Sequence, residues 1–510
     1  MKKRLWAFWQ SRWIQAGFSI AWALAILLLP ITSLPALGKM SGGSIIAPPS
    51  VLFFVGLALA WLAPYIAFSK RLPPISGLLF LFLISAGISW AGSFFLPISP
   101  FRGHMIQTEF REIILSLFIL LSVYLTTVAW VSQSPGRVRT TLQLVSISGL
   151  VLVLWSLLQA MFVLFLNGIY PRLIYQLQDL ISSRQGDILF PDRVTGMAYE
   201  PSWLAHQLVI IYLPLWLSAS IMRYSAFRQR LGWFSLENVL LLGGVLVLFM
   251  SFSRIGWLSF LLTLAVLLLK FNLDLIRSLR TRLKIRYTGG SRFFYTMITS
   301  TGVFLGFGLV YLGAIIGLVW LGSRLEPRLA RILAGDLTKI IDVYDLSNRL
   351  FFAERLVYWS AGWDVFGKYP WFGVGLGNAG FFFPQTMPSF GYGLTEIRNI
   401  FNYFTFLPNT KSMWVRLLAE TGMVGFSVFL TWLFILFQSA RVAVKIGTQE
   451  IRVLGWMGIL VLTAYLLEGF SLDSFSMPYF WFSLGLIGAS ASLALRNHQD
   501  AQIGTSNLEV

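Results

Sequence analysis

Hydrophobic residues in this chain fall into long runs that are separated by polar connections. A helix that rises about 1.5 Å per residue needs roughly 20 residues to cross a hydrocarbon layer about 30 Å thick, and the runs have about that length. Apolar and polar residues do not alternate within the runs, so they lack the pattern of barrel strands. The pattern predicts an all-α polytopic integral membrane protein with about 12 transmembrane helices. The predicted spans cover residues 14–36, 47–69, 75–98, 113–132, 141–166, 203–222, 235–252, 255–269, 297–322, 420–438, 453–471 and 478–495.

Lys and Arg collect in every second connection between these spans. Basic residues in short connections are retained on the cytoplasmic side of a membrane. The richest connection, residues 270–292, holds seven of them and is therefore predicted to be cytoplasmic. The same parity requires that residues 235–269, too long for one crossing, form a hairpin that turns near Ser251–Gly256 on the outside. Both termini are then predicted to lie in the cytoplasm.

Two long connections, residues 167–202 and 323–411, lie on the predicted outer side. The second contains nine Lys or Arg and seven Asp or Glu, which is typical of a polar segment that folds over a membrane site. Within it, Asp345–Ser347 can cap a short helix over residues 348–366 that ends before Pro370. The predicted organisation is transmembrane helices 1–5 at residues 1–166, an outer loop at 167–202, helices 6–9 at 203–322, the large outer loop at 323–411, helices 10–12 at 412–495 and a cytoplasmic tail at 496–510.

Composition supports the membrane interpretation and excludes several kinds of chemistry. Hydrophobic residues make up 56% of the chain and charged residues only 12%. The chain has no Cys, and its 3 His are far apart in sequence, so thiolate chemistry and zinc sites are not expected. No acidic cluster shows metal-ligand spacing, and we expect neither a metal nor another cofactor. The net charge of +18 follows from membrane topology and does not indicate nucleic-acid binding.

The centres of the predicted spans are almost free of charge, whereas cationic residues recur on the predicted outer connections. Guanidinium groups that converge there would suit a substrate that carries phosphate, because Arg pairs with phosphate in bidentate fashion. The alternative for each residue is contact with lipid headgroups or solvent. The set consists of Arg172, Arg184, Arg193, Arg254, Arg349, Arg355, Arg398 and Lys411.

Four local patterns stand out between residues 190 and 440. The first is RVTGMAYEPSWLA at residues 193–205, and the second is SFSRIG at residues 251–256. The third joins RLVYW at residues 355–359 to YPWFGVGLGN at residues 369–378, and the fourth is LLAETGMVG at residues 417–425. The glycines of the third pattern do not indicate a nucleotide loop, because no strand precedes them and the topology places them outside.

Taken together, the four patterns resemble the O-antigen ligase and O-antigen polymerase superfamily. The resemblance implies a glycosyltransferase of the bacterial cytoplasmic (inner) membrane whose active site faces outside. Its donor would be an undecaprenyl-diphosphate-linked glycan and its acceptor another glycan, without a metal or other cofactor. Membrane lipids and polysaccharide-export or chain-length-control proteins would be further partners, and nucleic acid would not.

The resemblance also assigns roles to individual residues. Arg193, Arg254 and Arg355 would bind the diphosphate, and Lys411 would be a fourth cation. Glu200 is the first candidate for the base that deprotonates the acceptor hydroxyl, although a carboxylate at a helix start can also serve only the helix dipole. The remaining candidates for substrate binding are Arg349, Trp359 and His206.

One position departs from the ligases of this superfamily. They usually have a His nine residues before the glutamate of the fourth pattern, where this chain has Lys411. An unperturbed Lys is mostly charged at neutral pH and would bind phosphate rather than accept a proton. The departure favours a polymerase over a ligase. His206 can substitute as a base, or it can be a structural hydrogen-bonding residue.

Two other functions also explain a dozen spans. A multi-span transporter or flippase would need a pathway across the membrane, and the charge-free span centres argue against one. A scaffold for an export complex would not need the set of outer arginines.

Overall fold

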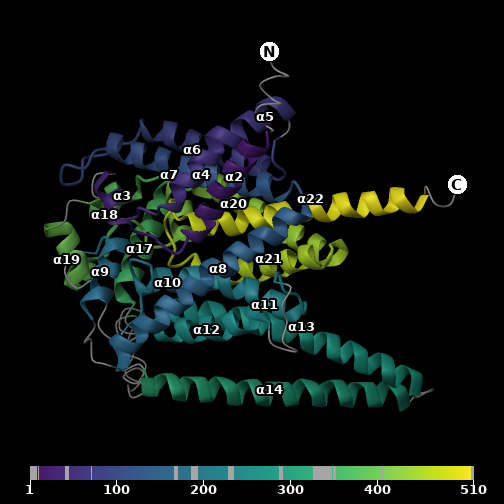
Figure 1. Cartoon of the computed structure of the whole chain (residues 1–510). Coiled ribbons are helices and arrows are strands. Elements are labelled where there is room, and N and C mark those ends of the chain that lie inside the picture. Colours follow the sequence, from purple (N-terminus) through teal and green to yellow (C-terminus); the bar gives the residue numbers. More distant parts are fainter. Residues whose placement is uncertain are drawn as a thin grey trace. The chain divides into compact units, whose positions relative to one another are not determined.

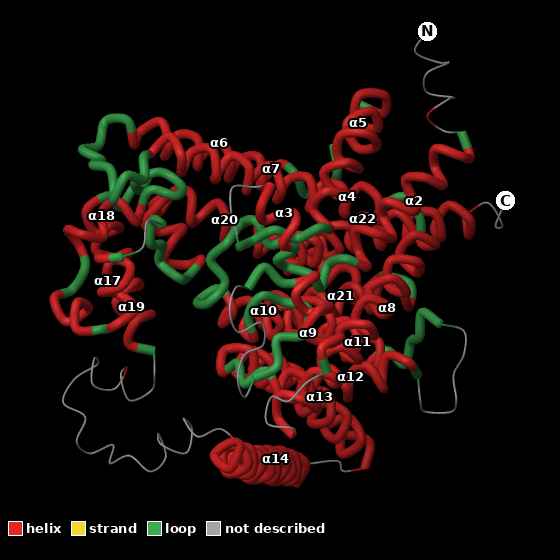
Figure 2. Tube along the Cα trace, turned by 60° about the vertical axis from the view of Figure 1, so that its left-hand side comes forward, coloured by secondary structure: helices red, strands yellow, loops and turns green. Residues whose placement is uncertain are grey.

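The computed structural model describes residues 9, 11–40, 45–70, 72–165, 171–184, 193–227, 235–286, 291–325, 347, 352–403 and 406–506. Regular structure in these ranges is helical (Figure 2). Apart from isolated bridges such as Phe101 with His104, no β-structure occurs within them. The all-α fold predicted from the apolar runs is therefore confirmed for the part of the chain that the structure describes.

The helices follow the predicted spans closely (Figure 1). The first half of the chain forms α2 (Arg12–Leu27), α3 (Pro35–Met40), α4 (Ser50–Leu57), η1 (Ala58–Leu62), α5 (Ala63–Ser69), α6 (Gly77–Ser93), α7 (Ile106–Val131), α8 (Pro135–Ala160), η2 (Met161–Phe165), α9 (Arg172–Ile181), α10 (Pro201–Gln207), η3 (Leu208–Tyr212), α11 (Leu213–Ile221) and α12 (Leu236–Met250). The second half forms α13 (Arg254–Arg286), α14 (Ser291–Leu325), α17 (Ala353–Lys368), α18 (Ala379–Thr386), η5 (Ser389–Gly393), α19 (Thr395–Asn402), α20 (Met413–Ile446), α21 (Gln449–Glu468) and α22 (Pro478–Ser506).

Eight helical segments among the described residues are long and apolar enough to cross a membrane. They are Ser50–Ser69, Ile106–Val131, Pro135–Leu164, Pro201–Ile221, Arg254–Ser278, Met413–Ile446, Gln449–Glu468 and Pro478–Gln499. Three shorter apolar helices, α2, α6 and α12, coincide with the first, third and seventh predicted spans and have 16, 17 and 15 residues. The ninth predicted span falls within α14. The fold agrees with an all-α membrane protein, and the count of about 12 crossings stays a prediction.

The first predicted span is not one continuous helix. Helix α2 ends at Leu27, and the chain then runs through turns and an extended segment before α3 begins at Pro35. Pro30 lacks a backbone N–H, and the residue before a proline is disfavoured in the helical conformation, so the apolar run 14–36 cannot remain helical to its end.

Two other expectations about helix ends are confirmed. The apolar segment 235–269 breaks between α12 and α13, where Phe252 has a φ of +48°. The helix expected in the large loop ends at Lys368, before Pro370. Residues 348–351, where that helix was expected to begin, lie outside the described ranges.

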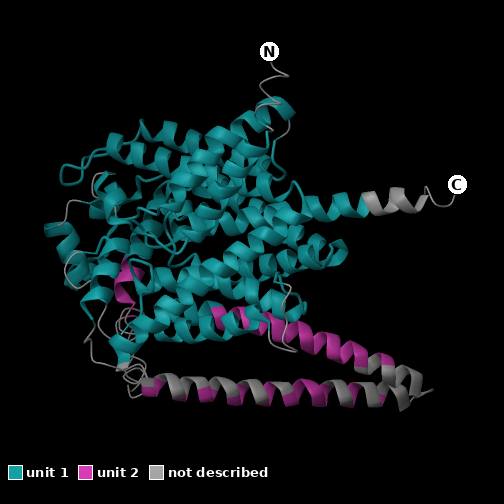
Figure 3. Ribbon diagram, in the orientation of Figure 1, with its two compact units in different colours: residues 1–259, 358–510 teal, residues 260–357 magenta. Residues whose placement is uncertain are grey.

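The chain divides into two compact units (Figure 3). One consists of residues 1–259 and 358–510, and the other of residues 260–357. In the first unit, α20 packs on α21, α22 and α6, while α22 also packs on α7. The helices approach closely where a glycine faces a neighbour: a Cβ on Gly455 of α21 would lie 2.7 Å from the carbonyl oxygen of Ala440 in α20. Small residues permit such backbone contact between membrane helices.

Candidate functional site

Two glutamine side chains hold the loop that leads into α10. The Gln159 Oε1 atom accepts hydrogen bonds from the backbone N–H groups of Thr195 and Gly196, both at 2.8 Å. Gln178 Nε2 donates to the Gly196 carbonyl oxygen at 3.3 Å. Gly196 has a φ of +58°, and a Cβ there would lie 2.6 Å from Ser156 Oγ, so only glycine fits this turn. The first of the four sequence patterns is therefore fixed to α8 and α9.

Arg193, at the start of the same pattern, reaches the turn between α12 and α13. Its Nε donates to the Ser251 carbonyl oxygen at 3.1 Å and its Nη2 to the Phe252 carbonyl oxygen at 3.0 Å. These carbonyls follow the end of α12, where the helix has orphan acceptors and a partial negative charge that a cation stabilises. Arg254 is the first residue of α13, two positions beyond Phe252. The structure thus brings the first and second patterns, with their two arginines, to one turn.

Helix α10 lies directly against the beginning of α13. A Cβ on Gly256 would lie 2.7 Å from the Ala205 Cβ, so the two helices touch at this point. Glu200 is the N-cap residue of α10 and makes no capping hydrogen bond with its side chain. Its Oε2 instead accepts a hydrogen bond from Ser202 Oγ at 3.1 Å. The candidate base and the turn that carries Arg254 are therefore attached to the same short helix.

Tyr199 precedes Glu200 and interacts electrostatically with nearby charged residues. Burial raises the pKa of the Tyr199 phenol, and the Glu200 carboxylate raises this pKa further, whereas the Arg184 guanidinium lowers it. Arg184, one of the predicted outer cations, therefore lies close enough to Tyr199 to interact with it electrostatically.

His206, in the last turn of α10, is hydrogen-bonded to a buried carboxylate. Its Nδ1 is hydrogen-bonded to Glu468 Oε2, at the end of α21. The His206 side chain is 2% exposed and the Glu468 side chain 0%. Among the described residues, Glu468 Oε1 has no hydrogen-bond partner. A buried carboxylate that accepts from one ring nitrogen fixes the orientation and tautomer of the imidazole. The pair couples α10 to the connection between α21 and α22.

That connection also holds the end of the large loop. Ser412 Oγ donates to the Gly469 carbonyl oxygen at 3.2 Å, and the Met413 N–H donates to the same oxygen at 2.7 Å. The Trp359 ring of α17 lies 5.4 Å from the Phe470 ring, measured between centroids. Three consecutive residues, from Glu468 to Phe470, thus contact three of the segments in which functional residues are predicted.

Lys411 occupies a constrained backbone position beside this connection. Its φ of +52° is uncommon for a residue with a side chain, and its N–H donates to Asn409 Oδ1 at 3.1 Å. Helix α17 packs against the preceding residue, since a Cβ on Gly362 would lie 2.7 Å from Thr410 Cγ2. Lys411 and Trp359 therefore belong to one packed region.

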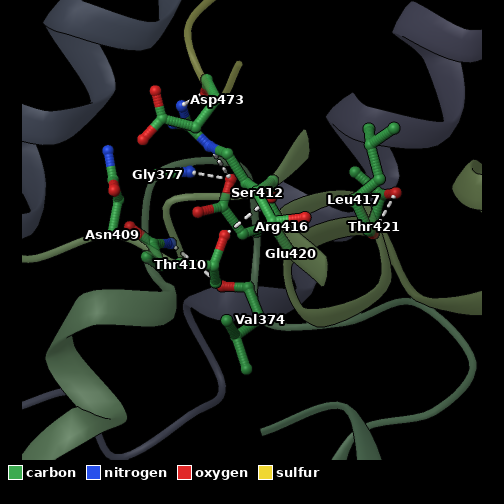
Figure 4. A network of polar contacts seen from close by, with 12 residues as sticks. Val374, Gly377, Asn409, Thr410, Ser412, Arg416, Leu417, Glu420, Thr421 and Asp473 are labelled. Carbon is green, nitrogen blue, oxygen red and sulfur yellow. Dashed lines mark hydrogen bonds and ion pairs between the residues drawn. The ribbon is translucent and has the colours of Figure 1, made fainter. Parts of the chain in front are cut away.

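A buried ion pair lies at the start of α20 (Figure 4). Arg416 Nε donates to Glu420 Oε2 at 2.9 Å, and the Gly377 N–H donates to the same oxygen at 2.8 Å. Arg416 Nη1 also donates to the Asp473 carbonyl oxygen at 2.6 Å, and the guanidinium lies 5.3 Å from the centre of the Phe475 ring. The charged groups thus connect α20, the glycine-rich loop of residues 369–378 and the α21–α22 connection.

The glycine-rich loop of residues 369–378 packs against Glu420 through both its carboxylate and its backbone. The Gly375 N–H donates to the Glu420 carbonyl oxygen at 2.9 Å and to Ser89 Oγ at 3.0 Å. Within α20, Gly422 departs from helical geometry with a φ of +62°, and a Cβ on it would lie 2.3 Å from the Trp371 carbonyl oxygen. The third and fourth sequence patterns are therefore two sides of one packed structure.

No family model matches the chain. No curated protein sequence matches it either. The resemblance to O-antigen ligases and polymerases consequently stands on the four patterns alone, and the superfamily remains a proposal for this protein.

Apart from Arg355, the predicted site residues that the structure describes fall into two groups. Arg193, Arg254 and Glu200 lie around the beginning of α10 and α13. His206, Trp359 and Lys411 lie around residues 468–470. Arg355 is one helical turn before Trp359 on α17, and Arg349 lies outside the described residues.

Sequence reasoning did not single out three polar residues that organise these groups. Arg416 lies four residues before Glu420 in an apolar run, a spacing that predicts an ion pair on one helix face. Glu468 stands at the end of an apolar run, where a carboxylate indicates a buried partner. Gln159 has no such signal, because its partners are the backbone atoms of a distant loop.

One further group of side chains has the types of atoms that bind metals. His104, Glu109 and Glu112 each offer one ligand atom, and these atoms all lie within 4.8 Å of one another. No acidic cluster with metal-ligand spacing was expected from the sequence, so the fold adds a group that the sequence alone did not indicate.

Proposed function

We propose that this protein is a membrane glycosyltransferase that acts on glycans carried by a lipid diphosphate on the non-cytoplasmic face. The observation that supports this most is that Arg193 binds the turn from which Arg254 begins α13, while α10, whose N-cap residue is Glu200, packs against α13. Arg254 and Glu200 stand at the starts of two membrane-length helical segments, Arg254–Ser278 and Pro201–Ile221. A guanidinium group and a carboxylate match what the transfer of a glycan from a diphosphate requires.

The proposed reaction is a substitution at the anomeric carbon of the donor sugar. An acceptor hydroxyl oxygen forms the new bond to this carbon, while the bond between the carbon and the diphosphate oxygen breaks. The bonding electron pair leaves with the diphosphate, and the hydroxyl proton passes to a base. Arg254, whose backbone begins α13, would stabilise the charge that develops on the diphosphate. Arg193 already binds two carbonyl oxygens, so its first role is to hold the turn that presents Arg254.

Glu200 is the proposed base. It is half-buried, and its hydrogen bond with Ser202 leaves lone pairs on the carboxylate that can accept a proton. His206 is less suited to this step, because its side chain is 2% exposed and its Nδ1 is occupied by Glu468. Lys411 in place of a histidine favours chain extension by a polymerase over transfer by a ligase.

The test uses the full chain in lipid nanodiscs with lipid-diphosphate-linked oligosaccharides from the native host. Products of the wild type, Arg254→Ala and Arg441→Ala are separated on a gel, with and without EDTA. Arg441 is an exposed arginine of α20 outside the set of predicted outer cations and provides the matched control. We expect a ladder of longer glycans from the wild type and the control, and none from Arg254→Ala.

Three other outcomes of this experiment would lead to different conclusions about the protein. A normal ladder from Arg254→Ala would refute the role of this arginine. A single transfer to an added acceptor would favour a ligase. If the wild type leaves the glycans unchanged but moves them across the bilayer, the protein is a flippase and the proposed function is wrong.

A further inference from the structure

A tight turn presents His104 next to the first turns of α7. The backbone groups of Phe101 and His104 exchange two hydrogen bonds, at 3.1 and 2.8 Å. The two residues between them, Arg102 and Gly103, have φ of +50° and +83°, so both are left-handed as in a type I′ turn. Arg102 Nη1 donates to the Phe401 carbonyl oxygen at 2.9 Å, which anchors the turn to α19. The position of the imidazole is therefore determined by backbone geometry.

Two carboxylates complete the group. Glu109 and Glu112 are three residues apart on α7, a spacing that places both on one face of the helix. His104 Nε2 lies 2.6 Å from Glu109 Oε1, and all the possible ligand atoms lie within 4.8 Å of one another. Ligands at about 2.0–2.2 Å from a metal ion lie roughly 3 to 4.4 Å from each other, so small side-chain adjustments suffice to place a cation among these atoms.

The charges around His104, Glu109 and Glu112 favour a bound cation at this position. Glu109 and Glu112 repel each other, and His104 is the basic group that binds Glu109. The guanidinium of Arg416 also attracts Glu109, but its Nε and Nη1 already bind Glu420 and the Asp473 carbonyl. A partial positive charge at the start of α7 accounts for one carboxylate in its first turn. It does not account for a second carboxylate and an imidazole directed to the same point.

We propose that His104, Glu109 and Glu112 bind a divalent transition-metal cation such as Mn²⁺ or Zn²⁺. One imidazole and two carboxylates suit these ions, and water would complete the coordination shell because Glu112 is exposed. The inference does not depend on the proposed glycosyltransferase activity. It replaces the expectation from the sequence that the protein has no metal site.

The cation would connect α7 to the glycine-rich loop. A Cβ on Gly377 would lie 3.2 Å from Glu109 Oε2, so this carboxylate adjoins the residue whose N–H holds Glu420. Fixing Glu109 should therefore also restrain the loop around Glu420. A cation that binds only the folded state raises the melting temperature, by an amount that grows with the logarithm of the ratio of its concentration to its dissociation constant.

The experiment measures binding of Mn²⁺ to the full chain in nanodiscs of uncharged lipid, by electron paramagnetic resonance, followed by displacement with Zn²⁺. Variants Glu112→Gln, Glu109→Gln and His104→Gln are compared with Asp179→Asn, which removes an exposed carboxylate of α9 outside the group. We expect one bound Mn²⁺ per chain in the wild type and in the control. Each of the three variants should bind at least tenfold more weakly, and only wild type and control should melt at a higher temperature with the metal.

Glu112→Gln is the decisive variant, because an exposed residue can be replaced without loss of the fold. The proposal is overturned if the wild type binds less than one Mn²⁺ or Zn²⁺ per chain. It is also overturned if Asp179→Asn weakens binding as much as Glu112→Gln does. Glycan transfer by the same preparations reports separately on the proposed function, so either proposal can fail while the other stands.

Discussion

The ion pair between Arg416 and Glu420 should behave as a single energetic unit. Glu420 is 1% exposed, and the same oxygen atom accepts from Arg416 and from the Gly377 N–H. Replacing Glu420 by Gln keeps the shape of the side chain and removes its charge. The guanidinium then remains buried with the Asp473 carbonyl and the Phe475 ring as its neighbours.

The expected loss of unfolding free energy depends on which charged group each substitution leaves without its partner. Removing one partner of a buried ion pair costs about 3–5 kcal/mol, because the other charge is left uncompensated. Glu420→Gln should lie near the lower end, since the amide oxygen can still accept from Gly377. Arg416→Met should cost about as much. The double variant leaves no buried charge, so its loss should be smaller than the sum of the two by at least about 2 kcal/mol.

The chain's 20 Trp make unfolding visible by fluorescence, so the free energies can be measured by titration with SDS in mixed micelles. Asp274→Asn is the matched control, because Lys270 and Asp274 form an ion pair with the same spacing but are 44% and 47% exposed. An exposed pair of this kind contributes less than about 1 kcal/mol. A coupling energy between Arg416 and Glu420 as small as that of the control pair would refute the reasoning.

Three further substitutions test other contacts of the site in the same unfolding titration. Gln159→Ala leaves the N–H groups of Thr195 and Gly196 without their acceptor and should cost about 2–4 kcal/mol. Gln143→Ala removes one of two hydrogen bonds to the Ala226 carbonyl oxygen, which Arg139 still binds, and should cost about 1 kcal/mol; equal losses would contradict this ranking. Gly377→Ala must adopt a φ of +87° with its Cβ 2.8 Å from Ile113 Cγ1, so we expect a loss of about 2–3 kcal/mol, and no loss would show that the loop is not fixed as described. Glu468→Gln should destabilise the protein by about 1–3 kcal/mol through loss of the charge-assisted bond to His206, and His206→Gln in addition should cost little more; additive losses would show that the two residues act independently.

The positions of helices were predictable because apolar runs of membrane length have few alternatives to helix. The predicted break near Ser251–Gly256 followed from length and charge parity, and it is confirmed. The continuous span over residues 14–36 was wrong, since run length was weighed without the effect of Pro30 on the backbone. Where helices end is thus set by single residues more than by the apolar character of the whole run.

The candidate site was predictable only in part. The meeting of Arg193 with the turn before Arg254 agrees with their roles in one site, which came from the resemblance. Contacts between residues far apart in sequence, such as His206 with Glu468, leave no local pattern. The group of His104 with two glutamates also depends on a turn whose left-handed Arg102 no propensity would indicate.

Three described helices contain a π-helical segment, and one of them, η3, begins directly after Gln207. A π turn bonds each residue to one five positions away instead of four, so it contains an extra residue compared with an α-helix. The wide turn absorbs this extra residue, so the side chains on either side keep the directions they would have in a regular helix. Loss of one residue within Leu208–Tyr212 would therefore restore a regular helix and leave His206 directed at Glu468. Loss of one residue from a purely α-helical stretch would instead rotate the side chains beyond it by about 100°. The length of this membrane segment can thus change by one residue at η3 without loss of the histidine–glutamate pair, and the gap in the alignment of a shorter relative belongs inside the helix rather than in a loop.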